Sequence, residues 1–161
     1  MRLPKIAMAT LVFALGTVVL AKPAPSAQCS TAKGAGSFAF TLSGTLILPT
    51  GPVPFAAVGR ADLKADGSVS GTEARSVGGE YADETFTGTF SFNADCTGAA
   101  TLNFYEDGQL VRVSVLSTIS DDNNREIRMV QKSLTLPNGI TLPVIATVDA
   151  VKISPEEEER Q

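Results

Sequence analysis

The sequence predicts an all-β protein, an eight-stranded antiparallel up-and-down barrel that follows a cleaved signal peptide. Apolar and polar residues alternate along almost every segment after residue 35, and this period of two is typical of half-buried strands. Short turn signals such as Asp66-Gly67 and Asn138-Gly139 separate the segments, which favours tight hairpins. The exported part of the chain shows no convincing helical stripe of apolar residues.

The predicted strands follow one another with short connections. They are 36–48, 55–65, 69–77, 85–93, 99–105, a strand marked by Val111, Val113 and Val115, and then 125–134 and 140–153. The Pro-rich segment 49–54 is expected to separate the first two strands. A two-sheet sandwich is the alternative fold, but the chain shows no long crossover of the kind that a Greek key requires.

The N-terminus has the pattern of an export signal. Arg2 and Lys5 precede the uncharged stretch 6–20, as in a signal peptide. A membrane-spanning helix needs roughly 20 apolar residues, so we expect no stable membrane anchor. We predict cleavage after Ala21, with Ala27 as the alternative site, and a secreted or periplasmic protein.

The chain then divides into four parts. These are the signal peptide 1–21, an N-terminal linker 22–35, the β-barrel domain 36–154 and a disordered acidic tail 155–161. The linker begins with a Pro-rich stretch, and the tail carries a run of glutamates; both compositions are typical of unpacked segments.

Composition excludes several classes of function. The chain has 17 acidic and 13 basic residues and a net charge of −4, which argues against nucleic acid as a partner. It contains no histidine, which excludes catalytic triads, Cys-His dyads and His-ligated zinc sites. We therefore expect no metal site and no cofactor, and the sequence does not indicate the oligomeric state.

Cys29 and Cys96 are the only cysteines, and both follow the export signal. Exported proteins enter an oxidising compartment, so we predict a disulfide between them. A redox-active pair usually has the closer C-x-x-C spacing. The predicted bond ties the start of the exported chain to the turn around Cys96.

The alternation directs large apolar side chains to one face. An eight-stranded barrel has an interior that side chains fill or that holds one small ligand. The residues are therefore consistent with a pocket for a small apolar molecule or with a packed core that has no cavity. The predicted inward set is Phe38, Phe40, Leu42, Phe86, Phe90, Phe92, Leu102 and Phe104.

Four polar residues are further candidates for a site. Glu73 and Arg75 share the parity of Val69 and Val77, so an inward-facing strand would put a charged pair at the cavity. If the strand faces the other way, both are solvated. Tyr81 and Tyr105 lie near strand ends and are candidates for hydrogen bonds at the mouth, or are ordinary rim tyrosines. The predicted ligand-binding residues are Phe38, Phe40, Phe86, Phe90, Phe104, Glu73, Arg75 and Tyr105.

The segment GTFSFNADCTGAATL, residues 88–102, resembles a motif of small exported bacterial proteins of unknown function. The segments 29–40, 54–60 and 66–68 match the same group, and the resemblance fades after about Tyr105. It implies a calycin-like or allene-oxide-cyclase-like barrel, without catalytic residues to carry over. Two alternatives to a ligand-binding barrel follow: a structural or surface-interaction protein with a filled barrel, and a cyclase or isomerase acting by confinement.

Overall fold

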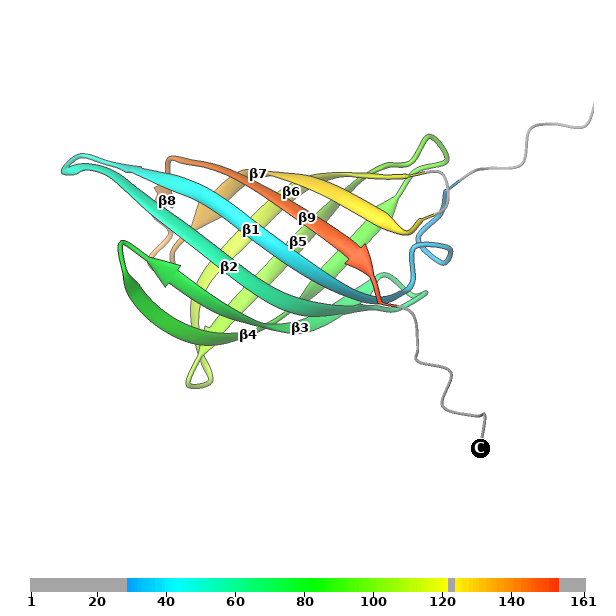
Figure 1. Cartoon of the computed structure of the whole chain (residues 1–161), viewed down its shortest axis with the longest axis horizontal. Coiled ribbons are helices and arrows are strands. Elements are labelled where there is room, and N and C mark those ends of the chain that lie inside the picture. The colour runs from blue at the N-terminus through cyan, green and yellow to red at the C-terminus, as the bar shows by residue number, and fades with distance from the viewer. Residues whose placement is uncertain (1–28, 122–123, 154–161) are drawn as a thin grey trace, which may run out of the picture.

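The chain folds into an up-and-down barrel of antiparallel strands (Figure 1). The computed structural model describes residues 29–121 and 124–153, so the predicted signal peptide and acidic tail lie outside the described residues. The strands are β1 (Gly36–Leu48), β2 (Gly51–Leu63), β3 (Ser68–Val77), β4 (Glu80–Phe92), β5 (Thr97–Glu106), β6 (Gln109–Ser120), β7 (Glu126–Thr135), β8 (Thr141–Leu142) and β9 (Val144–Lys152).

The sheet closes on itself. Its strands follow the order β6-β5-β4-β3-β2-β1-β9-β7-β8, and an additional pairing between β6 and β7 joins the two sides. β8 is only a two-residue segment, so eight long strands form the wall. Because each long strand has a neighbour on both sides, the described barrel leaves no long edge for pairing with another chain. The predicted eight-stranded antiparallel barrel is confirmed.

Prolines explain two differences between the predicted and observed strands. The expectation that 49–54 separates the first two strands is wrong for residues 51–54, since β2 includes Pro52 and Pro54. The pairing of β2 with β3 stops at Phe55, so no β3 residue needs the missing N–H donors of these prolines. The predicted last strand is β8 and β9, which are interrupted at Pro143. The carbonyl of Pro143 accepts a hydrogen bond from the Ile47 amide at 2.9 Å.

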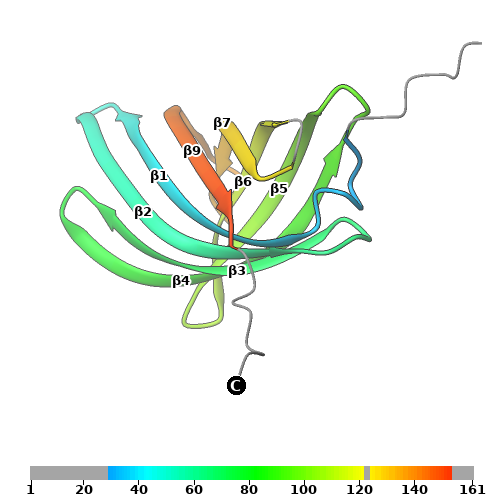
Figure 2. The same ribbon diagram turned by 45° about the vertical axis from the view of Figure 1, so that its right-hand side comes forward.

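A turn before β1 covers one end of the barrel. Residues 29–35 lie at the same end as the β4–β5 hairpin in both views (Figures 1 and 2). The Phe92 amide donates to Thr31 Oγ1 at 3.2 Å, and a Cβ on Gly34 would lie 2.7 Å from the Phe92 ring. Lys152 Nζ donates to the Ala35 carbonyl at 2.6 Å. The turn therefore packs directly against the Phe92 ring at this end of the barrel.

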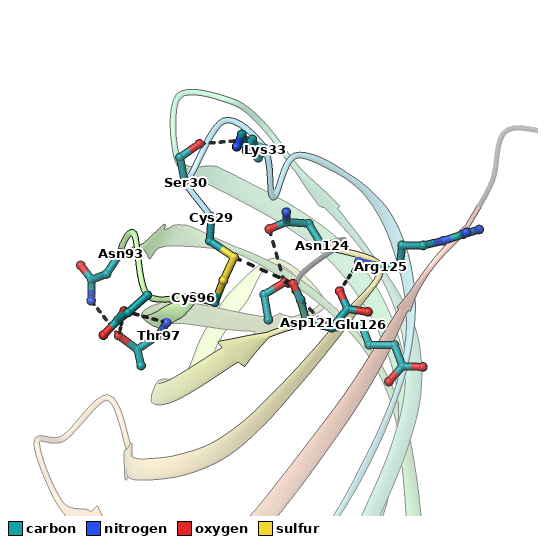
Figure 3. Close-up of a disulfide and its surroundings, with 12 residues drawn as sticks. Cys29, Ser30, Lys33, Asn93, Cys96, Thr97, Asp121, Asn124, Arg125 and Glu126 are labelled. Atoms are coloured by element: carbon teal, nitrogen blue, oxygen red, sulfur yellow. Dashed lines mark hydrogen bonds between the residues drawn. A yellow bond between two sulfur atoms is a disulfide. The ribbon is translucent and has the colours of Figure 1, made fainter. Parts of the chain in front are cut away.

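A disulfide between Cys29 and Cys96 holds this turn in place (Figure 3). The Cα atoms are 4.9 Å apart, and both cysteines are buried. The Ser120 amide donates to the Cys96 carbonyl at 3.0 Å. The bond thus ties the N-terminal turn, the β4–β5 hairpin and the end of β6 together, and it is consistent with an oxidising compartment outside the cytoplasm.

We expect the disulfide to contribute a large part of the stability. The cysteines are 67 positions apart. Closing a loop of this size lowers the conformational entropy of the unfolded chain, which raises the free energy of unfolding by about 4 kcal/mol. The double variant Cys29→Ala and Cys96→Ala should lose about that much free energy of unfolding in urea titrations. As a control, alkylation of the unreduced wild type should label no thiol. A wild type with two labelled thiols would contradict the prediction.

Candidate functional site

The barrel encloses a cavity of about 210 Å³ that is lined mostly by apolar side chains. An engineered cavity of about 150 Å³ lined by Leu, Ile and Phe binds benzene, so this lumen has room for a molecule larger than benzene. The predicted inward residues all line the lumen: Phe38, Phe40, Leu42, Phe86, Phe90, Phe92, Leu102 and Phe104.

Aromatic rings lie against the wall of the lumen over inward-facing glycines. Phe40 is opposite Gly59, and Phe86 is opposite Gly71. A Cβ would lie 2.5 Å from Phe40 Cζ at Gly59 and 2.3 Å from Phe86 Cζ at Gly71. Phe104 continues the row, with its ring centroid 5.3 Å from that of Phe86. A Cβ would also lie 2.3 Å from the Thr72 carbonyl oxygen at Gly59 and 2.2 Å from the Arg60 carbonyl oxygen at Gly71. A larger residue at either glycine would therefore displace the neighbouring strand as well as the ring.

Four charged side chains form an ion cluster in this apolar lumen: Glu73 and Arg75 from β3, Glu84 from β4 and Arg112 from β6. Arg75 donates through Nε and Nη2 to Glu84 Oε1 at 2.9 and 2.6 Å. Arg112 donates through Nη2 to Glu73 Oε1 at 2.6 Å and through Nη1 to Glu84 Oε2. The carboxylates are almost fully buried, with 0% of the Glu84 side chain and 1% of the Glu73 side chain exposed.

The geometry explains why two arginines are present. Glu73 and Glu84 occupy directly opposite positions on β3 and β4, where two like charges destabilise a strand pair. Arg112 bridges both carboxylates. Its guanidinium also lies 3.9 Å from the centroid of the Phe104 ring, a cation–π contact that favours the positive charge.

The two carboxyl groups have opposite pKa shifts. Burial raises the pKa of Glu73 to about 7, because the charge of Arg112 offsets desolvation only in part and Glu84 adds to the rise. Burial also acts to raise the pKa of Glu84, but the hydrogen bonds and positive charges of Arg75 and Arg112 outweigh it and hold that pKa below its usual value. Glu84 is therefore the ionised partner of the arginines, whereas Glu73 titrates near neutral pH.

A second polar group lies on β6 and β7. Gln131 Nε2 donates to Ser114 Oγ at 2.9 Å and to the Ser133 carbonyl at 3.2 Å. Ser114, Gln131 and Thr118 also line the lumen. Thr118 Oγ1 is buried without a hydrogen-bond partner among the described residues. The lumen is thus apolar over most of its wall, with polar atoms on a few strands.

The structure brings most of the predicted site residues together. Glu73 and Arg75 both line the cavity, so β3 faces inward at these positions, but their partners are Arg112 and Glu84. Tyr105 does not line the cavity: it borders a groove on the outer face with Asp107 and Arg60. Tyr81 is 68% exposed, and its hydroxyl donates to Asp83.

Glu84 and Arg112 are site residues that sequence reasoning missed. Glu84 lies just outside the predicted strand 85–93, but β4 begins at Glu80, and the parity that Glu84 shares with Phe86 was the available signal. Arg112 alternates in sequence with Val111, Val113 and Val115, so regular alternation places it on the opposite face of the strand from these valines. A register shift between Phe104 and Tyr105, where β5 pairs with β6, turns Arg112 inward. As a result Ser114, Leu116 and Thr118, and not Val113 and Val115, are the buried positions of β6.

Comparisons with known proteins leave the family open. No protein-family model matches the sequence, and no curated protein matches it. Among solved structures, the barrel is similar to the S-type phycobiliprotein lyase CpeS from Guillardia theta. That match has 8% sequence identity and a TM-score of 0.44, and it covers 78% of this chain and 92% of the lyase chain. The similarity is too weak to support an argument about function.

Residues 29–121 and 124–153 contain no helix that is long and apolar enough to cross a membrane. The same residues contain no group of three or more Cys, Asp or Glu side chains placed to hold a metal ion.

We expect Glu73 to make the protein less stable as the pH rises. Its pKa is about 7 in the folded protein against an ordinary value of 4.5. The folded state therefore binds more protons between these values, and the free energy of unfolding falls across this window. Glu73→Gln should remove up to about 3 kcal/mol of this decline. Urea titrations at several pH values measure it, and parallel profiles for the two proteins would contradict the prediction.

Removal of Glu84 should be costly, because it leaves the partly buried arginines Arg75 and Arg112 with one carboxylate between them. Breaking a buried ion pair costs about 3 kcal/mol or more, so Glu84→Gln should lower the free energy of unfolding by about that amount. Glu80→Gln, at an exposed position of the same strand, is the matched control and should change it by less than about 0.5 kcal/mol. Equal effects of the two substitutions would show that the cluster does not stabilise the fold.

Proposed function

We propose that this protein binds a small, largely apolar molecule inside its barrel and acts as an exported binding protein. The observation that supports this most directly is the cavity of about 210 Å³ within a closed wall. Apolar pockets with a few convergent polar groups are the usual form of small-molecule sites. The predicted residues Phe38, Phe40, Phe86, Phe90 and Phe104 provide the apolar surface in this proposal, and Glu73 and Arg75 the polar contacts.

The wall of the barrel is suited to a binding site whose shape is formed before the ligand enters. Every long strand contributes a side chain to the lining, and the Phe86 ring lies against those of Phe40 and Phe104. A ligand would therefore enter a lumen whose shape the sheet already fixes, with little ordering of loops on binding. A filled structural barrel agrees less well with the cavity volume. The cyclase or isomerase interpretation stays a prediction.

The test is binding of a neutral apolar fluorophore, N-phenylnaphthylamine, to the purified exported protein. Its fluorescence should rise on binding in an apolar site, and the rise should saturate. Ala100 is buried and lines the lumen opposite Phe90. Ala100→Trp would fill the lumen and should weaken binding by about tenfold or more, since each 1.4 kcal/mol of lost affinity is tenfold.

Ala99 provides the matched control. It is the neighbouring residue on β5 and is exposed, so Ala99→Trp places the same side chain outside the barrel and should leave binding unchanged. Circular dichroism and thermal unfolding check that both variants fold, because overpacking costs about 1–3 kcal/mol. If Ala100→Trp does not fold, Ala100→Leu replaces it. Equal binding by the lumen variant and the Ala99→Trp control would reject the proposed site.

A further inference from the structure

One buried oxygen in the lumen lacks a hydrogen-bond donor. Glu73 Oε1 accepts a hydrogen bond from Arg112, whereas Oε2 is buried without a donor among the described residues, and the Glu84 carboxylate opposite can accept a hydrogen bond from Glu73 only when Glu73 is protonated. The residue is only 4% exposed and lines the cavity. Buried polar atoms in folded proteins nearly always have a partner. Oε2 is therefore a polar contact point for a molecule in the lumen.

Arg75 supplies a donor next to this oxygen. It is two residues from Glu73 on β3, so both side chains point to the same face of the strand, and both line the lumen. Its Nε and Nη2 donate to Glu84. At 21% exposure its side chain is also more accessible than that of Arg112, at 11%.

The charge of the cluster depends on Glu73. Arg75 and Arg112 bring two positive charges and Glu84 brings one negative charge. Ionised Glu73 makes the cluster neutral, and protonated Glu73 leaves one positive charge. An uncompensated charge is costly in an apolar interior. A guest carboxylate would balance the protonated form, but it would add an excess negative charge to the ionised form.

We propose that the lumen binds an amphiphile with an apolar body and one carboxylate head, and that each ligand bound is accompanied by protonation of Glu73. This inference rests on the proposed function. The proton comes from the solvent and resides on Glu73 Oε2, where the guest carboxylate replaces Glu84 as the acceptor. Arg75 donates to the same carboxylate, and the apolar body lies among the aromatic rings. No covalent bond forms or breaks.

The surroundings of Glu73 contain the charges that this coupling needs. β4 presents Glu84 and β6 presents Arg112, while β2 places an uncharged Gly59 directly opposite. Arg60 and Asp62 pair on the outer face of β2, where their side chains are 60% and 46% exposed. Among the described residues, the charged groups that face Glu73 are therefore those of the ion cluster. Because burial raises the pKa of Glu73 to about 7, the coupling falls near neutral pH.

The experiment compares decanoate, decanol and decylamine, which share one apolar chain and differ in the head group. Calorimetric titrations at about pH 5.5 and about pH 8.5 bracket the pKa of Glu73, which is about 7. Decanoate affinity should fall by about thirtyfold between them, because each pH unit above the pKa costs tenfold when only the protonated form binds. Decanol affinity should change little. Near neutral pH, titrations in phosphate and Tris should show net proton uptake with decanoate.

Variants connect this behaviour to the cluster. Glu73→Gln keeps an acceptor for Arg112 and mimics the protonated acid, so it should bind decanoate equally well at both pH values and take up no proton. Arg75→Gln should lose the preference for decanoate over decanol. Glu80→Gln, which is exposed on β4, should keep the pH dependence of the wild type. Thermal unfolding without ligand checks that each variant is folded.

The outcomes separate this inference from the proposed function. Tighter binding of decylamine than of decanoate, growing as the pH rises, would show that ionised Glu73 recognises a cation and would overturn the inference. Equal, pH-independent binding of all three compounds would also overturn it, and a lumen site for apolar molecules would remain. If none of the compounds binds and N-phenylnaphthylamine does not bind either, both proposals fail.

Discussion

Closure of the sheet is the constraint on which the rest of this structure depends. Once β6 pairs with β7, every second side chain of each strand points into a lumen whose width the closed sheet fixes. Each inward position must then be apolar or find a partner inside the barrel. The rings of the lumen satisfy the first condition, and the ion cluster satisfies the second. The turn of residues 29–35 is needed for the same reason, because it covers the apolar end that Phe92 would otherwise expose.

The ion cluster is not explained by stability alone. Burying charged groups costs several kcal/mol for each ion before their attraction is counted, and well-packed apolar residues often serve a fold equally well. The arrangement is also unequal: Glu84 accepts from both arginines, whereas Glu73 accepts only from Arg112 and keeps one oxygen without a donor among the described residues. One carboxylate therefore holds the arginines in place, and the other presents an adjustable charge to the lumen. This division of roles is typical of sites in which the environment pushes two pKa values apart.

The sequence allowed prediction of what depends on local periodicity. Alternation identified the strands and the inward aromatic residues. It also showed that Glu73 and Arg75 share the parity of Val69 and Val77, but it left open whether that face points inward. It did not identify the partners of these two residues, because those depend on contacts between strands. Arg112 turns inward through an irregularity in the pairing of β5 with β6, and an irregularity of register has no signature in the composition of one strand. Resemblance to a family of exported proteins stays a prediction, since no family model matches the chain.

The cavity itself follows from small residues in the wall and not from a shortage of large ones in the interior. Gly44 is opposite Phe55, and Gly98 is opposite Phe92. A Cβ would lie 2.7 Å from Phe55 Cζ at Gly44 and 2.8 Å from Phe92 Cδ1 at Gly98, so each ring occupies space that the glycine leaves free. The rings placed in this way line a cavity of about 210 Å³. A barrel of this width is readily filled by its own side chains, and the pairing of phenylalanine with glycine leaves space inside this one.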